Sequence, residues 1–312
     1  MISLMRQHHD MRHLPQARRG IIDEDELWSL FCDEQKIERG KIMADLYRNR
    51  DQVKGYASYR PNYPPELFNF IFSKTTGSQL AWDVGTGSGQ AAVSLSSLFD
   101  VVVATDSSPE QISHAPTHLP NVRFVVTPPS LTAPDLHRLV APPGSVDLIT
   151  VATTLHWLDI PAFFAQAHAV LRRPGGVVAV WGYSCDLLIG GGRVEEISRR
   201  IYEAICPYWE KDVREMVQDG YAGVDFPFDA VEGAEEGTAP VRKFAAEREM
   251  GVGELIGLWQ TSTAYQRARK AGVELITEEV VEELKRAWVE EDGELNKKKM
   301  VRFPISLRIG KV

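Results

Sequence analysis

A glycine-rich turn follows an apolar segment near residue 84 and has the residue types needed to hold a cofactor. The segment 81–90 reads AWDVGTGSGQ, so Gly85, Gly87 and Gly89 follow the acidic Asp83. Glycine tolerates unusual backbone conformations and lets a ligand lie directly on the chain. The start of a following helix also offers unpaired N–H groups. We therefore expect an adenosine-containing cofactor at this turn.

The spacing of the glycines distinguishes two classes of cofactor. A dinucleotide fingerprint, G-x-G-x-x-G, counted from Gly85 would need its third glycine where Gln90 stands. The observed pattern, D-x-G-x-G-x-G, instead resembles that of class I S-adenosylmethionine-dependent methyltransferases. This resemblance implies that the methionine part of the cofactor lies on Gly85, Thr86, Gly87 and Gly89. Asp83 is then expected to meet the methionine ammonium, directly or through water.

A second acidic residue, Asp106, ends the next apolar segment, VVVATD. Ligands of open α/β sheets bind at the carboxyl ends of strands, so Asp106 is expected to hold both ribose hydroxyls through charge-assisted hydrogen bonds. The alternative is that Asp106 caps the following helix, a role for which Ser108 is better placed. The stretch TPPSL after the third strand has no carboxylate for adenine, so backbone groups are expected there. The further cofactor positions are Ser107, Ser130 and Leu131.

The elements that must position these residues alternate along the chain from Met43. Segments rich in Val, Ile and Leu alternate with segments of helical spacing, which indicates a parallel sheet covered on both faces. Strands are expected at 79–84, 101–106, 122–127, 146–153 and 177–183, and helices within 63–74, 89–99 and 159–176 and from 109. The fold class is therefore α/β, doubly wound and Rossmann-like, with a mostly parallel seven-stranded sheet and a helical cap.

The alternation divides the chain into four parts. Residues 43–183 form the expected cofactor-binding core, and 184–240, where the alternation lapses, form a cap insertion. Residues 241–312 are expected to complete the sheet and supply cap helices. Residues 1–42 precede this pattern as an extension that is expected to be poorly ordered, although 22–39 could form a short helix.

Composition excludes several classes of protein. The formal net charge is −8 over 312 residues, which does not favour a broad nucleic-acid surface. The three cysteines lack CxxC spacing, so neither a disulfide framework nor a metal site is expected. No apolar run approaches the roughly 20 residues that a membrane span needs. We expect a cytoplasmic monomer or homodimer that uses a small-molecule acceptor and contacts neither nucleic acid nor membrane.

Several short motifs narrow the resemblance to one family, the methyltransferases related to trans-aconitate methyltransferase, which include many plant proteins without assigned substrates. The motifs are ASYRPNYP, TTLHWLD, FPFDAV, LWQTSTAYQ and FPISLRIGK. The similarity runs from about Met43 to Val312. It implies O-methylation of a small carboxylic acid, with N- or O-methylation of a specialised metabolite as the alternative. A non-catalytic scaffold that only binds the cofactor is a third, different hypothesis.

The same resemblance implies roles for residues before the first helix and after the fourth strand. Tyr56, Tyr59, Arg60 and Tyr63 lie in a segment that closes over the cofactor in this family. Arg60 either pairs with the methionine carboxylate or is a surface residue at a helix start. Tyr56 and Trp157 could favour the sulfonium by cation–π attraction, although Trp157 could instead be a core residue. Position alone places Thr153 and Leu155 on the cofactor floor.

His156, which follows the fourth strand, is the candidate catalytic residue. It could act as a general base, hold a substrate oxygen by a hydrogen bond, or be structural. The acceptor pocket is expected to be an apolar enclosure with few polar groups. Its candidate residues, each of which could instead be core, are Tyr59, Tyr63, Tyr183, Trp209, Phe226, Phe228, Trp259, Ser262 and Tyr265.

Overall fold

The computed structural model describes residues 59–184, 187–232 and 242–312, with side chains of the last range described from Phe244 onward. The chain divides into two units, Met1–Ile42 and Met43–Val312, and every described residue belongs to the second. The predicted helix over 22–39 and the predicted cofactor contact Tyr56 lie outside the described residues.

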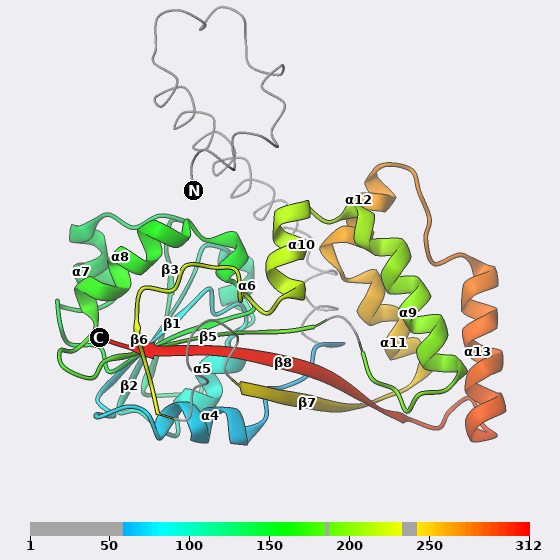
Figure 1. Ribbon diagram of the computed structural model, residues 1–312, viewed down its shortest axis with the longest axis horizontal. Helices are drawn as coiled ribbons and strands as arrows, with labels where there is room; N and C mark the ends of the chain where they lie inside the picture. Colours follow the sequence, from blue (N-terminus) through cyan, green and yellow to red (C-terminus); the bar gives the residue numbers. More distant parts are fainter. Residues whose placement is uncertain (1–58, 185–186, 233–241) are drawn as a thin grey trace, which may run out of the picture. The chain divides into compact units, whose positions relative to one another are not determined.

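One sheet organises the described part of the chain, where eight strands are hydrogen-bonded (Figure 1). The order is β3-β2-β1-β4-β5-β8-β6, and β7 pairs with β8 off this path. The first five strands are parallel and the remainder antiparallel. The predicted α/β class with a mostly parallel sheet is confirmed, and the strand beyond the expected seven is the two-residue β6. The bounds are β1 Leu80–Val84, β2 Val101–Asp106, β3 Val122–Val126, β4 Leu148–Ala152, β5 Val177–Tyr183, β6 Asp229–Ala230, β7 Arg242–Met250 and β8 Lys299–Lys311.

The central strands are mostly apolar because both of their faces are covered. All residues of β5 are buried, as expected for a parallel strand between helical layers. The indole N–H of Trp82 on β1 donates to Thr105 Oγ1 on β2 at 3.0 Å, whereas the buried indole nitrogen of Trp181 on β5 has no hydrogen-bond partner among the described residues. The core therefore fixes the register of β1 and β2, whose carboxyl ends carry the two acidic residues.

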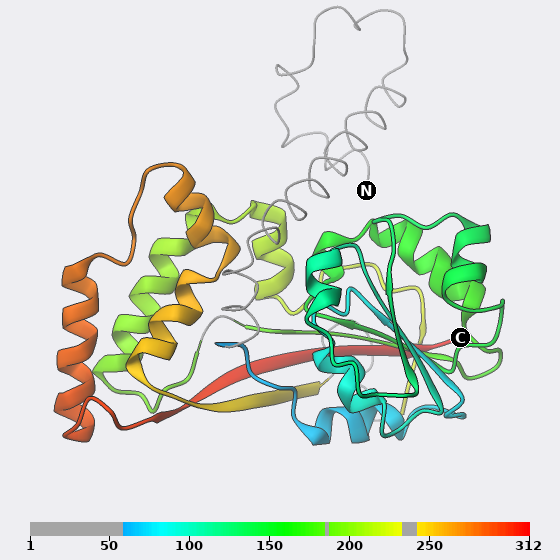
Figure 2. The same ribbon diagram turned by 180° about the vertical axis from the view of Figure 1, so that it is seen from behind.

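Helices cover the two faces of the sheet (Figures 1 and 2). Leu67 and Leu95, of helices α4 and α5, belong to the apolar cluster on one face, and Leu136 and Phe163, of α7 and α8, belong to the cluster on the other. Helix α8 begins after its cap Asp159 and ends at Val170, within the predicted range 159–176. The bounds are α4 Pro65–Phe72, α5 Gln90–Leu95, α6 Pro109–Ser113, α7 Ala133–Leu139 and α8 Ile160–Val170.

A second group of helices lies beyond the sheet along β7 and β8, as both views show (Figures 1 and 2). Helix α9 buries Ile197, Ile201 and Ile205, a four-residue spacing that gives it one apolar side. Within the described residues, no helix has the length and apolarity needed to cross a membrane. The bounds are α9 Arg193–Ile205, η4 Cys206–Tyr208, α10 Lys211–Gln218, α11 Val252–Gln260, α12 Thr263–Lys270 and α13 Glu278–Asp292.

Candidate active site

The glycine turn between β1 and α5 requires its glycines. Gly85, Gly87 and Gly89 have φ of 62°, 58° and 93°, a region that other residues rarely adopt. A Cβ on Gly85 would lie 2.2 Å from Thr154 Cγ2, whereas a Cβ on Gly87 would meet nothing closer than 3.8 Å. Gly85 is therefore packed against the loop after β4, and Gly87 leaves bare backbone facing open space.

Asp106 at the end of β2 holds this turn from the side. Its Oδ2 accepts a hydrogen bond from the Gly87 N–H at 2.8 Å, and its Oδ1 accepts one from the Ser108 N–H at 2.8 Å. Burial raises the pKa of Asp106 against these lowering hydrogen bonds. The residue that caps α6 is Ser108, not Asp106, because the Ser108 side chain accepts a hydrogen bond from the Gln111 N–H. Asp106 lines the cavity beside the turn, where its oxygens can accept further hydrogen bonds.

Asp83 lies beneath the turn and not on the cavity wall. Its side chain is fully buried, and it does not line any of the three cavities described below. The Thr86 hydroxyl donates to Oδ2 at 2.5 Å and the Thr150 hydroxyl to Oδ1 at 2.7 Å. Burial raises the pKa of Asp83 to about 6. Asp83 therefore ties the turn to β4. Its carboxylate does not face a cavity, so it is not placed for the expected direct contact with the methionine ammonium.

A cavity of about 780 Å³ lies on the glycine turn. Tyr63 and Thr153 line it and contact each other, with 3.2 Å between their hydroxyl oxygens. The predicted residues on its wall are Arg60, Tyr63, Gly85, Thr86, Gly87, Asp106, Ser107, Thr153, Trp157 and Tyr183, and those that the sequence analysis missed include Gln90, Gln111 and Thr154. Gly89 instead caps α5, and Leu155 is buried in the core.

A neighbouring cavity of about 800 Å³ shares Gly85, Asp106 and Trp157 with this one. The predicted Ser130 and Leu131 line it, as do Asp159 and Gln166, which the sequence analysis did not identify. The Gln166 amide donates to the Leu131 carbonyl at 2.9 Å. This cavity continues the glycine-turn cavity beyond Asp106, where the adenine end of an adenosyl cofactor is expected.

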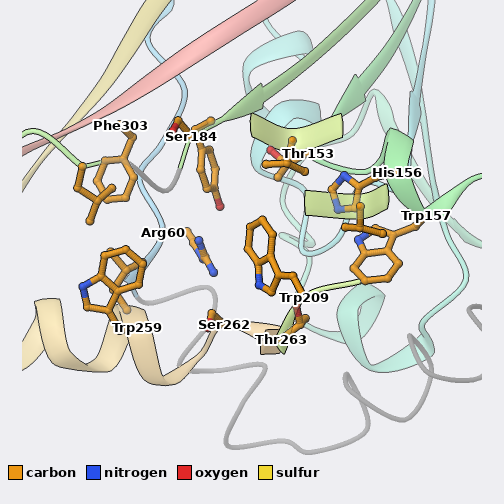
Figure 3. Close-up of a pocket in the computed structure, with 15 residues that line it drawn as sticks. Arg60, Thr153, His156, Trp157, Ser184, Trp209, Trp259, Ser262, Thr263 and Phe303 are labelled. Carbon is orange, nitrogen blue, oxygen red and sulfur yellow. The ribbon is translucent and has the colours of Figure 1, made fainter. Parts of the chain in front are cut away.

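A third cavity, of about 760 Å³, is the candidate acceptor pocket (Figure 3). Figure 3 shows His156 and Trp157 on one side of it, Trp259 and Phe303 on the other, and Arg60 between them. The predicted residues on its wall are Arg60, Thr153, His156, Trp157, Tyr183, Trp209, Trp259 and Ser262, and the missed ones are Ser184, Leu187, Val213, Val217, Leu258, Thr263 and Phe303.

Four residues line both the acceptor pocket and the glycine-turn cavity: Arg60, Thr153, Trp157 and Tyr183. The guanidinium of Arg60 lies 5.5 Å from the centroid of the Tyr183 ring. Its backbone carbonyl accepts a hydrogen bond from Arg248 at 2.9 Å. A group transferred between ligands in the two cavities would therefore pass these four side chains.

Five predicted acceptor-pocket residues lie elsewhere and correct the sequence analysis: Tyr63 lines the glycine-turn cavity instead, and the other four line none of the three cavities. Tyr59 packs on Gly257, where a Cβ would come within 2.5 Å of its ring. The Tyr265 hydroxyl donates to Glu274 Oε1 at 2.7 Å, and the residue is buried in the core. Phe226 and Phe228 pack edge-on against Phe164 of α8, on the face of the sheet that α8 covers. Aromatic side chains in this part of the chain fill the core as readily as a pocket, and no local pattern separates the two.

His156 has a partner that the sequence analysis missed. It lies in the short helix η3 (Leu155–Trp157) with 7% of its surface exposed, and its Nδ1 is 2.9 Å from the hydroxyl of Tyr221. The two residues are 65 positions apart, so no local pattern could pair them. In the sequence, the glycine-bearing loop GYAGV, residues 220–224, is the only local feature that draws attention to Tyr221.

The site fits S-adenosylmethionine. The open face at Gly87 leaves room for the methionine portion, Asp106 offers carboxylate oxygens at a strand end, and a connected cavity extends toward Ser130. Within the described residues, no group of three or more His, Cys, Asp or Glu side chains could hold a metal ion. A doubly wound sheet with this turn defines a class I methyltransferase.

Comparison with known proteins agrees with that class. A family model described as a methyltransferase domain matches residues 82–180. The chain is 29% identical to a protein named as a methyltransferase from Dictyostelium discoideum, over 83% of this chain and 92% of that protein. It is 31% identical to a methyltransferase of Pestalotiopsis fici, but over only 55% of each chain. A solved structure described as a type II methyltransferase from Anaeromyxobacter dehalogenans superimposes with a TM-score of 0.67 at 29% identity, over 81% of this chain and 97% of that one.

The chain is therefore a class I, S-adenosylmethionine-dependent methyltransferase with a Rossmann-like fold.

Proposed function

We propose that this methyltransferase acts on a small molecule and methylates the oxygen of a carboxylic acid. The supporting observation is the acceptor pocket, which opens past Arg60 and Thr153 toward the glycine turn. Among the described residues on its wall, Arg60 is the only lysine or arginine, and there is no aspartate or glutamate. An anionic group with an apolar body matches this combination of one cation and an aromatic wall.

The cofactor is assigned to the cavity on the turn. Asp106 would hold the ribose hydroxyls, and the Gly85–Gly89 backbone would carry the methionine portion. Arg60 is placed to meet either the methionine carboxylate or the acceptor, because it lines both cavities. When bound, the cofactor supplies a methyl group attached to a sulfonium sulfur. The sulfur leaving group needs no proton when the methyl group is transferred.

A carboxylate acceptor suits this site because it is ionised at neutral pH and needs no base. The protein then has chiefly to orient two ligands, which can lower a barrier by roughly 7–11 kcal/mol. Trp157, Trp209 and Trp259 would hold the apolar body of the acid, and Arg60 its charge. This pocket therefore favours a monoacid. Trans-aconitate, the substrate that the resemblance would suggest, has three carboxylates, which would meet a single guanidinium in this pocket.

The aromatic wall also favours a second candidate, N- or O-methylation of a specialised metabolite with a ring system. Four of the wall residues, Trp157, Trp209, Trp259 and Phe303, present large apolar surfaces. Such surfaces bind flat ring systems whatever atom receives the methyl group.

The test is methyl transfer from isotope-labelled S-adenosylmethionine, first to a panel of aryl and alkyl monoacids with trans-aconitate included, then to a metabolite extract. We expect labelled methyl esters of monoacids, identified by mass spectrometry. Labelled ethers or amines without esters would replace the first candidate by the second. Cofactor binding without any labelled product would point to a scaffold that binds the cofactor and does not transfer its methyl group.

A further inference from the structure

His156 and Tyr221 form a buried pair at the edge of the acceptor pocket. The His156 Nδ1 and the Tyr221 hydroxyl oxygen are 2.9 Å apart, and the two rings are nearly parallel, at 15° with centroids 6.1 Å apart. Tyr221 is 1% exposed and does not line the pocket, whereas His156 does. The phenol therefore lies behind the imidazole as seen from the pocket.

Separate elements hold Tyr221 in this place. Its backbone has φ of 65°, a conformation that is unfavourable for a non-glycine residue and that persists where the surroundings enforce it. Arg308 of β8 donates to the carbonyls of Tyr221 and Val224 at 2.6 and 2.5 Å. Gly182 of β5 allows the ring to approach, since a Cβ there would lie 3.2 Å from it.

The chemistry of the two rings sets the direction of their hydrogen bond. A phenol O–H is a stronger acid than a neutral imidazole N–H, and an imidazole nitrogen accepts a hydrogen bond better than a phenol oxygen does. The better bond therefore runs from the Tyr221 O–H to Nδ1. In neutral His156 the ring proton then resides on Nε2.

We infer that Tyr221 is a positioning residue that fixes His156 as an N–H donor, through Nε2, toward the acceptor. This inference rests on the proposed function and narrows it. A fixed N–H donor binds an oxygen that already carries a lone pair, such as a carboxylate, and does not remove a proton from a hydroxyl or an amine. Of the three roles open to His156, the fixed tautomer argues against the general base, and the place of His156 on the pocket wall favours the holding of a substrate oxygen over a purely structural role.

Nitrogen-15 NMR of the full-length protein labelled at histidine tests the inference directly. The spectra are taken at about pH 8, where a histidine of ordinary pKa is neutral, with and without S-adenosylhomocysteine. Replacement of His156 by Gln assigns its signals. We expect a protonated Nε2 and an unprotonated, hydrogen-bonded Nδ1. A protonated Nδ1 would overturn the inference, because Nε2 would then be a proton acceptor.

Tyr221→Phe removes only the hydroxyl, and Tyr265→Phe is its matched control, because Tyr265 is also a buried tyrosine with a hydrogen-bonded hydroxyl but lies off the pocket. In Tyr221→Phe we expect His156 to become a mixture of the two neutral tautomers, whereas Tyr265→Phe should leave the spectrum unchanged. Gly182→Ala keeps the phenol but crowds its ring, so it should give the same mixture. Unchanged His156 signals in Tyr221→Phe would contradict the positioning role.

Activity separates a donor from a base, using the acid that the acceptor panel yields. Glutamine supplies an N–H donor but no base, so His156→Gln should stay within about tenfold of the wild-type turnover while His156→Ala falls further. Equal losses of roughly 10²–10⁴-fold in both variants would instead establish a base. If S-adenosylhomocysteine does not bind in calorimetry, the proposed function fails, and the tautomer measurement on the free protein still decides the role of Tyr221.

Discussion

At the scale of single residues, local spacing predicted the cofactor side of the site better than the acceptor side. The glycines and Asp106 form a pattern within 22 residues of Gly85, and they meet because adjacent parallel strands end at the same edge of the sheet. The depth of Asp83 was not predictable, because its burial depends on Thr150 of β4 as well as Thr86. The His156–Tyr221 pair likewise depends on packing between distant segments.

Replacing Asp106 by alanine should weaken S-adenosylmethionine binding at least tenfold. The change removes the carboxylate proposed to hold the ribose and also the acceptor of the Gly87 and Ser108 N–H groups. Isothermal titration calorimetry measures the affinity. Asp135→Ala, which removes an exposed carboxylate of α7, is the control. An unchanged affinity in Asp106→Ala would remove the ribose assignment.

At the scale of elements, the parallel strands were predictable because each is a continuous apolar run between helical segments. The cap helices were recognisable from their spacing, but the residues that they turn toward the pocket were not. Helix α12 illustrates this: its cap Ser262 lines the pocket, while Tyr265, within its first turn, is buried against Glu274. β6 has only two residues, too few for any periodicity to show.

The glycine turn provides a test at this scale. Gly85→Ala would combine an unfavourable φ of 62° with a Cβ 2.2 Å from Thr154 Cγ2. We expect it to lower the melting temperature and weaken S-adenosylhomocysteine binding. Gly272→Ala is the matched control, since Gly272 has φ of 79° but open space around its Cβ position, and it should show only the backbone cost of about 1–2 kcal/mol.

Adding Thr154→Ser to Gly85→Ala separates the two causes. Serine keeps the hydroxyl that donates to the Gly85 carbonyl at 3.1 Å and removes the crowding methyl group. The double variant should recover part of the steric loss, since the Cβ and Oγ of residue 154 would still lie about 2.9 and 3.0 Å from the new methyl group, and none of the backbone part. No recovery, measured by thermal unfolding and calorimetry, would mean that contact with Thr154 is not what confines this position to glycine.

At the scale of the whole molecule, a fully buried carboxylate links the site to the stability of the fold. The pKa of Asp83 is raised from 3.8 to about 6 by burial, so between about pH 4 and pH 6 the folded state holds a proton that the unfolded state has lost. Its contribution to the free energy of unfolding is therefore full below about pH 4 and is lost as the pH rises to about 6. The pKa difference of about two units between the folded and unfolded states corresponds to a loss of folding free energy on the order of 3 kcal/mol once Asp83 is ionised.

Asp83→Asn should therefore be more stable than the wild type above pH 6 and similar below pH 4, in the protein without cofactor. Carboxyls whose pKa is lowered by hydrogen bonds and ion pairs, such as Glu254 and Glu283, have the opposite pH dependence. The difference between variant and wild type in urea unfolding across this range isolates Asp83. A constant difference between pH 4 and 7 would show that Asp83 does not change its protonation state on unfolding.

β8 gives the enzyme a particular order of assembly. It follows every other described element in the sequence, yet it lies against the edge of β5, supplies Phe303 to the acceptor pocket and anchors the Tyr221 backbone through Arg308. On the ribosome, the five parallel strands emerge first and carry an unpaired apolar edge until this segment arrives. A nascent chain that folds its parallel strands before β8 is made would therefore expose the kind of sheet edge that aggregates.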